Sequence, residues 1–538
     1  MKTAFYNGIV YTGGLPLQEA FIVEDGRFGS VGTTADILSC LRPEDKRVDL
    51  EGRFVCAGFN DSHMHLLNFG QTLHGAGLAQ HTGSLKEMLT YLKTYLKENY
   101  PHPGQWLKGR GWNQDYFADE KRMPTRQDLD SVSREVPILI TRACGHSCVV
   151  NSLVLDLAGI DRNTPDPEGG SIGRDEAGEP NGILYENAIE LLNTVKPLPD
   201  KAELKEMILL AMGAVNRYGI TSVQTDDYST FRGVPWQLIH SVYRELEAEG
   251  KMTVRVNEQC NFTDLDELRT FIEDGNVTGK GSDLFRIGPL KLLGDGSLGS
   301  RTAHLSMPYL KESSCGFSLF DPAYLKELVT YAHRNGMQIA VHAIGDACLD
   351  EVLDAYETAL TQYPREDHRH GIVHCQISRR DQLERMARLD LHVYAQSIFL
   401  DYDNHIVEKL VPPELAVSSY SWKTLLKKGV CVSNGSDCPV ELPNVMAGIQ
   451  CAVTRRSFDG CGPFLPDEAF TVREALDSFT SAGAHASFEE GKKGRIRKGM
   501  LADFVILSGN PFRTEPADLR SIAVQAAYLG GEKIFEKE

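Results

Sequence analysis

The stretch that decides the fold lies at residues 58–66, which read Gly-Phe-Asn-Asp-Ser-His-Met-His-Leu. An apolar, strand-like segment at residues 53–58 leads into it. Because alternate side chains of a strand share a face, His63 and His65 can point at one place. Two neutral imidazoles that meet at one point make half of a divalent metal site. A His-x-His pair alone is more often a surface or packing feature, so the prediction depends on further ligands at strand ends.

The rest of the chain supplies such ligands in a definite order. Three further apolar runs end in His342, His374 and Asp437, and a fourth run is interrupted by Lys291. Together with the first pair, four histidines, one aspartate and one lysine lie at or near the ends of hydrophobic strands. This inventory is typical of a two-metal hydrolase.

The order of the segments predicts the architecture. Eight strands are expected, within the segments 53–58, 219–225, 252–257, 286–296, 337–346, 371–375, 391–396 and 430–437. Amphipathic helices alternate with them, for example at 201–218 and at 321–332, where Asp321 is placed to cap the helix. Alternating strands and helices predict an α/β fold, a (β/α)₈ TIM-like barrel whose active site lies at the carboxyl ends of the strands.

The length of the chain requires domains beyond the barrel. Its 538 residues exceed the about 250 of a bare barrel. Short strands at 1–57 and at 491–538 are too few to form a core separately, and we expect them to pair into one small β-sandwich domain. The barrel then occupies 58–490, with an inserted domain at about 70–200 after the first strand, because one crossover helix would fill only part of that interval.

The motifs resemble those of a known family. The order of His63-Met64-His65, Lys291, His342, His374 and Asp437 is similar to the metal-binding signature of the amidohydrolase superfamily. The phrases at 291–303 and 341–346 resemble the subgroup that contains N-substituted formamide deformylase and the YtcJ-like proteins. This resemblance spans nearly the whole chain, and it implies the same barrel with a β-domain made from both termini.

The four histidines and Asp437 can be assigned roles in metal binding and catalysis. We expect His63 and His65 to hold a first ion that Asp437 completes, and His342 and His374 to hold a second. Such ligands accept zinc, manganese, iron or cobalt, of which zinc is the first expectation. Asp437 is also expected to take a proton from the attacking water and return it to the leaving nitrogen.

Lys291 needs a separate explanation, because a lysine cannot by itself bridge two ions. The resemblance implies that carbon dioxide carboxylates Lys291 to a carbamate that spans both metals. The alternative is an unmodified lysine whose tip reaches the mouth of the pocket.

Other polar residues are candidate substrate contacts. Asp295, Ser297 and Arg301 lie in a glycine-rich loop after the lysine strand, and Arg301 could hold a carboxylate. Trp112 and His146 lie in the insertion, which by resemblance approaches the mouth of the active site. Packing or loop geometry could also account for each of these residues.

Three functions remain open. The leading hypothesis is a metal-dependent hydrolase acting on a non-peptide C–N bond, as in an N-formyl, N-acyl or cyclic amide. A deaminase with one metal on the same scaffold is the nearest alternative, and it would not need Lys291. The chain could instead be a non-catalytic binding protein that retains the fold. Serine hydrolysis is disfavoured because the sequence around Ser297 lacks the first glycine of G-x-S-x-G.

The composition of the chain restricts the binding partners and the cellular location that we expect. The net charge of −18 argues against nucleic acid and anionic membrane as partners, because both require a basic face. No apolar stretch has the length of a signal peptide core or a membrane span, so we expect a cytoplasmic protein. Its twelve cysteines are expected to be reduced. A small-molecule amide is the expected partner, and a homodimer is the default oligomer.

Overall fold

The computed structural model describes residues 2–99, 105–143, 146–167 and 169–538. The chain divides into two compact units. One unit combines Met1–Asn68 with Ala211–Glu538, and the other is Phe69–Leu210. The second unit is the insertion after the first barrel strand.

The first unit contains an eight-stranded parallel sheet in the order β7-β14-β15-β16-β17-β18-β19-β20. These strands are β7 (Phe59–Met64), β14 (Ile220–Thr225), β15 (Arg255–Asn261), β16 (Phe285–Leu293), β17 (Ile339–Ala343), β18 (Gly371–His374), β19 (His392–Ala395) and β20 (Cys431–Asn434). The sheet curves round until its two ends meet. Past β20, the Asp437 amide donates to the His63 carbonyl at 2.9 Å, and the His65 amide donates to the Cys438 carbonyl at 2.8 Å. The predicted TIM-like barrel is confirmed.

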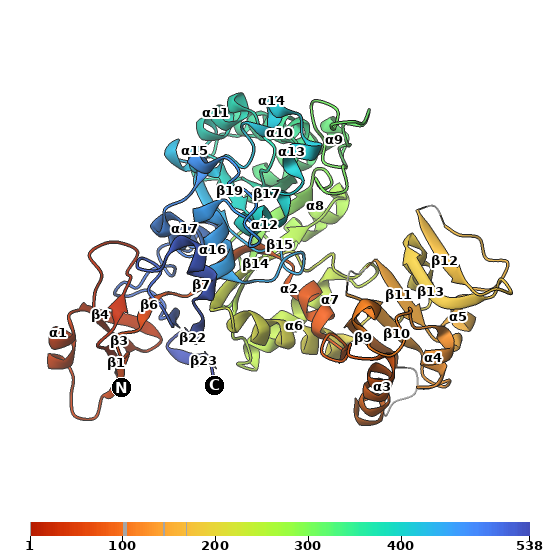
Figure 1. The fold of residues 1–538 in the computed structure, drawn as a ribbon. Helices are drawn as coiled ribbons and strands as arrows, with labels where there is room; N and C mark the ends of the chain where they lie inside the picture. Colours follow the sequence, from red (N-terminus) through yellow and green to blue (C-terminus); the bar gives the residue numbers. More distant parts are fainter. Residues whose placement is uncertain (1, 100–104, 144–145, 168) are drawn as a thin grey trace. The chain divides into compact units, whose positions relative to one another are not determined.

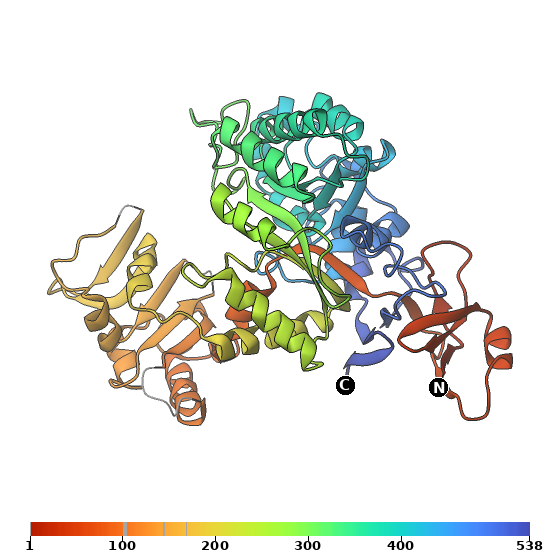
Figure 2. The same cartoon turned by 180° about the vertical axis from the view of Figure 1, so that it is seen from behind.

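Helices follow most of the barrel strands and lie outside them (Figure 1; Figure 2, from behind). They are α7 (Trp236–Ala248), α8 (Leu265–Glu273), α9 (Pro322–Arg334), α10 (Asp346–Gln362), α11 (Arg380–Arg388), α15 (Trp422–Lys427), α16 (Val445–Thr454), α17 (Val472–Ser478) and α18 (Ser481–Ala486). Helix α9 begins as expected, because the Asp321 side chain accepts hydrogen bonds from the Ala323 and Tyr324 amides. Helix α6 (Lys201–Asn216) precedes β14.

The apolar run before the first histidines does not belong to the barrel. Its core, β6 (Phe54–Ala57), pairs in parallel with β2 (Ile9–Val10) and antiparallel with β21 (Phe504–Leu507) in a separate sheet. The barrel strand β7 starts only at Phe59. Two consecutive strands were therefore predicted as one. Gly58 separates them, and a Cβ atom there would lie 2.2 Å from Thr221 Oγ1, so only glycine fits at this crossing.

Both termini contribute to one small β-domain. Its five-stranded sheet has the order β2-β6-β21-β22-β23, and its four-stranded sheet has the order β4-β3-β1-β5. The remaining strands are β1 (Thr3–Tyr6), β3 (Ala20–Glu24), β4 (Arg27–Gly32), β5 (Lys46–Asp49), β22 (Val524–Leu529) and β23 (Glu532–Glu536). One apolar core joins the sheets, and in it Phe5 of the N-terminal piece packs edge-on against Phe504 of the C-terminal piece at 4.9 Å. The predicted β-sandwich is confirmed.

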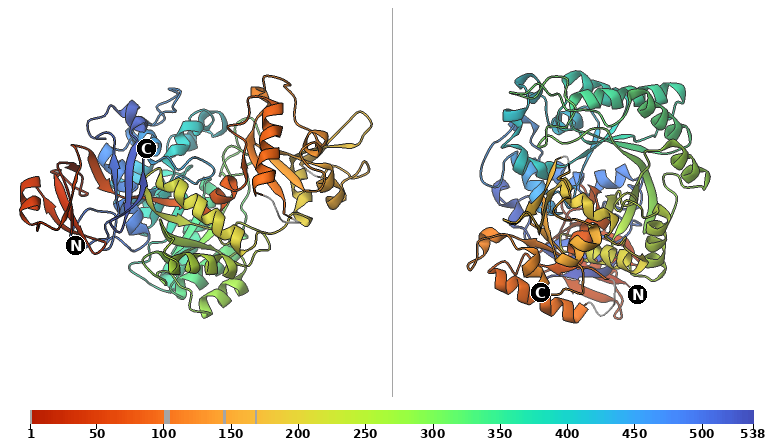
Figure 3. Two further views of the ribbon diagram at one scale, coloured as in Figure 1. Left: turned by 90° about the horizontal axis from the view of Figure 1, so that it is seen from below. Right: turned by 90° about the vertical axis from the view of Figure 1, so that its right-hand side faces the viewer.

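The inserted unit has its own six-stranded sheet, in the order β12-β13-β11-β10-β9-β8. The strands are β8 (Ala76–Gly77), β9 (Leu107–Trp112), β10 (Ile138–Arg142), β11 (Ser147–Val150), β12 (Gly170–Arg174) and β13 (Pro180–Glu186), with helices α3 (Leu85–Asn99), α4 (Arg126–Asp130) and α5 (Ser152–Ala158) (Figure 3). Two apolar clusters form its core.

Across the parts of the chain that the structure describes, no helix has both the length and the apolar character needed to span a bilayer.

Candidate metal centre

The first three predicted ligands meet at the carboxyl ends of β7 and β20. His63, His65 and Asp437 place their ligand atoms within 4.8 Å of one another. Asp437 Oδ1 lies 3.3 Å from His63 Nε2 and 2.9 Å from His65 Nε2. The three side chains come from opposite ends of the sequence, and barrel closure brings them together.

The second pair of histidines lies next to this group. The His374 ring is 4.4 Å from the His342 ring and 5.7 Å from the His63 ring, measured between centroids. Lys291 on β16 is 1 % exposed, and its Nζ lies 3.8 Å from Asp226 Oδ2. Asp226 in turn contacts His65 Nδ1, so the buried lysine reaches the first group through one carboxylate.

Neighbouring amides and carbonyls set the orientation of three imidazoles. His63 Nδ1 lies 2.8 Å from Gln259 Oε1, and His374 Nδ1 lies 2.7 Å from Gln396 Oε1. An amide oxygen only accepts, so each Nδ1 carries the proton and each Nε2 keeps its lone pair. His342 is reversed, because its Nε2 donates to the Gly296 carbonyl at 3.0 Å and leaves Nδ1 as the acceptor. Such fixed tautomers are the usual support of metal-binding histidines.

The backbone is also held in unusual conformations at this site. His374 has φ 72° and Asp437 has φ 57°, both in the left-handed region that non-glycine residues seldom adopt. Buried Asp61 fixes the neighbouring turn, because its carboxylate accepts from the Ser436 amide at 3.0 Å and from the Ser436 hydroxyl at 2.5 Å. Strain of this kind is concentrated at functional sites.

Charges within the group suit metal ligands. Burial lowers the pKa of His63 and, together with neighbouring His342, lowers the pKa of His374 well below its ordinary value, so both rings are neutral. Burial opposes charge on Asp437, but the neighbouring imidazoles of His63 and His65 outweigh burial and hold the pKa of that carboxyl well below its usual range. Neutral imidazoles and an ionised carboxylate are the forms that bind divalent ions.

His65 behaves differently from the other histidines. Burial disfavours its charge, but Asp226 and Asp437 outweigh burial and raise the pKa of His65 well above the ordinary value. A divalent ion bound to His65 must therefore displace a proton that two carboxylates stabilise.

Three residues of the site were not predicted from the sequence: Asp226, Gln259 and Gln396. Asp226 follows β14 directly, so the strand-end signal that identified the histidines would also have found it. Gln259 lies within the buried strand β15 and Gln396 lies just after β19, where an amide gives no distinctive pattern.

The loop after β16 uses its polar residues internally. Asp295 is 1 % exposed, and its carboxylate accepts from the amides of Ile344, Gly345 and His304 at 2.8–3.0 Å. Ser297 bonds to neighbouring hydroxyls, and Arg301 pairs with Glu312 at 3.0 Å. Asp295 was predicted to contact substrate, but these hydrogen bonds give it a structural role beside His342. Ser297 and Arg301 remain accessible for the substrate contact that we predicted.

The two candidates in the inserted unit differ in exposure. Trp112 is 0 % exposed within the apolar core of that unit. His146 is exposed, and its Nδ1 lies 2.9 Å from Glu186 Oε2. Packing therefore accounts for Trp112, and His146 is the one of the two that a ligand can reach.

Four histidines, a buried lysine and an aspartate at the carboxyl end of an eight-stranded barrel define the class of metal-hydrolase barrels. The model of the amidohydrolase family matches residues 46–535. The chain belongs to this family.

Similar proteins agree with this assignment. The chain is 32 % identical over 547 residues to a putative amidohydrolase YtcJ of Bacillus subtilis, with all of both chains covered. It is 28 % identical to an N-substituted formamide deformylase of Arthrobacter pascens, covering 96 % of this chain and 95 % of that one. An uncharacterized metal-dependent hydrolase from Pyrococcus furiosus has a similar structure, with TM-score 0.77, 28 % identity, and 95 % and 100 % of the two chains covered. The family and the metal-dependent structural neighbour imply a divalent metal.

Proposed function

We propose that this protein hydrolyses a non-peptide C–N bond, in an N-formyl, N-acyl or cyclic amide, with the help of two divalent ions. One observation carries the proposal: six side chains suited to a two-metal site converge where a barrel enzyme has its active site. A relative named for deformylation of N-substituted formamides supports the choice of bond.

The residues fit divalent ions. His63, His65 and Asp437 would hold one ion, and His342 and His374 would hold the other. Their nitrogen and oxygen donors suit zinc first, and also manganese, iron or cobalt. A divalent ion in such a site supplies Lewis acidity, which makes water nucleophilic and a carbonyl electrophilic at neutral pH.

Lys291 is suited to carboxylation. Burial lowers the pKa of its ammonium, which increases the fraction of neutral amine. The nitrogen lone pair can attack the carbon of carbon dioxide, and loss of one proton leaves an anionic carbamate. We propose that this carbamate supplies the bridging charge that an unmodified lysine lacks.

Asp437 is the proposed catalytic residue. Its Oδ1 faces both His63 and His65, so it lies where attacking water would be held. We propose that the carboxylate accepts a proton from the water during attack on the carbonyl carbon. The same proton then moves to the nitrogen as the C–N bond breaks, which restores the carboxylate and releases an amine.

A mononuclear deaminase is the second candidate. Near the barrel mouth, only His63, His65 and Asp437 form a three-residue group with ligand atoms within 4.8 Å in the described part of the chain. Lys291, unmodified, would then neutralise Asp226. The number of ions in the centre separates this function from the first.

The insertion is proposed to shape substrate choice, because it leaves the strand that carries the first histidines. His146 is the residue of this unit that we propose to contact substrate, since Trp112 has a packing role. Ser297 and Arg301 are proposed contacts from the loop after β16.

The test is a panel of N-formyl, N-acyl and cyclic amides incubated with metal-loaded protein, with ring amidines as the deaminase arm. We expect amine release from at least one amide class and its loss after chelation. Ammonia release from the amidines alone would favour the deaminase. No turnover in either arm, with ions bound, would support a binding protein.

A further inference from the structure

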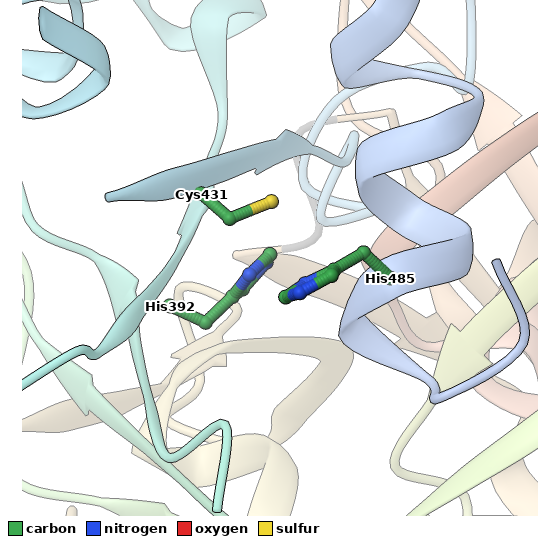
Figure 4. A group of neighbouring side chains, drawn as sticks. All are labelled: His392, Cys431 and His485. Atoms are coloured by element: carbon green, nitrogen blue, oxygen red, sulfur yellow. The ribbon is translucent and has the colours of Figure 1, made fainter. Parts of the chain in front are cut away.

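A second group of metal-binding side chains lies at the opposite end of the barrel. His392 and Cys431 are the first residues of β19 and β20, and they are direct partners across these parallel strands. His485 comes from α18. The ligand atoms of the three lie within 4.8 Å of one another, and Figure 4 shows the thiol and the two rings gathered in one place. The predicted catalytic ligands all lie at the other ends of the strands.

One ring nitrogen of His392, Nδ1, is left without a hydrogen-bond partner among the described residues. His392 Nε2 lies 2.8 Å from Ser433 Oγ, and that hydroxyl donates its own proton to the Val393 carbonyl at 3.5 Å. With the Ser433 hydroxyl donating to the Val393 carbonyl, His392 Nε2 is the donor to Ser433 and Nδ1 carries the lone pair. His392 is 1 % exposed, and its Nδ1 has no hydrogen-bond partner among the residues that the structure describes.

His485 repeats this pattern. Its Nδ1 is also buried and without a hydrogen-bond partner in the described part of the chain. The two rings are nearly parallel, at 23°, with centroids 6.1 Å apart. Buried polar nitrogens are normally satisfied, so two unsatisfied ones beside a free thiol call for an explanation. A shared metal ion would satisfy both.

The surrounding charges favour a cation. Arg369 is the nearby positive group, and it is already paired with Asp367 at 2.7 Å and with Glu490 at 2.8 Å. Asp390 adds a further negative charge that acts on both Cys431 and His485. Three carboxylates and one guanidinium thus act on this group of side chains. Cys431 and His485 are partly exposed, which gives an ion access.

We propose that His392, Cys431 and His485 form a zinc site that joins β19, β20 and α18 at the amino-terminal end of the barrel. Two imidazoles and one thiolate are a nitrogen and sulfur donor set that zinc prefers. Tetrahedral zinc needs ligand atoms about 3.5 Å apart, given Zn–N and Zn–S bonds of about 2.0–2.3 Å. Small side-chain rotations would bring the three atoms to that spacing, and solvent would complete the shell.

Its role would be structural. The amino-terminal face of such barrels serves stability, whereas chemistry occurs at the other face. Burial raises the pKa of the Cys431 thiol to about 12, so an ion binding there must displace a proton from sulfur, as coordinating thiols generally require.

Cobalt substitution tests the proposal independently of catalysis. The predicted catalytic ligands contain no sulfur, so a thiolate-to-cobalt charge-transfer absorption in the full-length protein reports on Cys431. We expect this band with Co²⁺ alone as the probe, and we expect its loss in Cys431→Ser and in His485→Gln. His485→Gln is the variant that best preserves the fold, because His485 is partly exposed and glutamine is of similar size.

The matched control is Cys438→Ser, a buried cysteine beside the catalytic end. This variant should keep the band. Zinc content should fall by about one ion per chain in Cys431→Ser and His485→Gln relative to the control. Absence of the band in the wild type, or unchanged zinc content and band in folded His485→Gln, would overturn the proposal. Loss of the band in Cys438→Ser alone would assign the thiolate to the catalytic end instead.

Discussion

We propose that Asp437 acts both as a metal ligand and as a general base, because it touches two histidines of the metal centre and its pKa is held low. In Asp437→Asn an amide oxygen still faces the same histidines, but it cannot take up a proton. We therefore expect kcat to fall at least ~100-fold, the usual contribution of general acid–base catalysis, with a much smaller change in KM. Steady-state kinetics at equal metal content would check this. An unchanged kcat would leave Asp437 as a ligand only.

Lys291 gives a second prediction at the residue scale. Lys291→Ala should lose the bridging charge, part of the bound metal and most of the activity. Short carboxylic acids should restore part of both, because they can occupy the space of the carbamate. Lys493 is also buried, at 4 % exposed, and pairs with Glu489, so Lys493→Ala is the matched variant that acids should not rescue. Full metal content and turnover in Lys291→Ala would contradict the carbamate.

The sequence pattern was sufficient to predict which side chains would converge at one end of the barrel. The histidines, Lys291 and Asp437 each interrupt or end an apolar run, and barrel geometry brings such ends together. Pattern was not sufficient for Gln259 and Gln396, because a buried amide within a strand gives no sign of the imidazole that it orients. The role of Asp295 was equally hidden, since its partners are backbone amides 9 to 50 residues away.

At the scale of elements, the contact between β7 and β20 decides whether the first metal group forms. Gly435 lies between them, and a Cβ atom there would be 2.5 Å from the His63 amide nitrogen and 2.6 Å from its carbonyl oxygen. Both neighbours are backbone, so they cannot move aside cheaply. Gly435→Ala should lower stability by about 1–3 kcal/mol, as overpacking does, and should also weaken metal binding.

Gly213 provides the control for this prediction. It lies inside α6, and a Cβ atom there would meet no heavy atom within 4 Å. Gly213→Ala should therefore be neutral or stabilising by about 0.5–1 kcal/mol. Thermal unfolding and metal analysis of both variants would check the pair. Equal behaviour of the two variants would show that the close approach at Gly435 does not matter.

Element boundaries were predictable only where the chain itself marks them. Asp321 marked the start of α9. The junction between β6 and β7 was missed, because Phe54–Ala57 and Phe59–Met64 both read as strand and only Gly58 separates them. The partners of β6 come from both ends of the chain, so no local pattern could show that it leaves the barrel.

At the scale of the whole molecule, barrel closure brings residues 63 and 437 into contact, and the termini build a β-domain from segments nearly 500 residues apart. These arrangements followed from the alternation of strands and helices and from the two short terminal pieces. The identity of the substrate cannot be predicted from the barrel architecture, because the loops and the insertion determine which substrate binds.

The central claim is that two divalent ions lie together at the carboxyl end of the barrel. Anomalous diffraction at the absorption edge of the bound metal, from crystals of protein prepared without chelators, tests it most directly. We expect two peaks, one among His63, His65 and Asp437 and one beside His342 and His374, with continuous density for a carboxylated Lys291 between them. A single peak at the first group, with an unmodified Lys291 amine in fully metal-loaded protein, would contradict the two-metal mechanism.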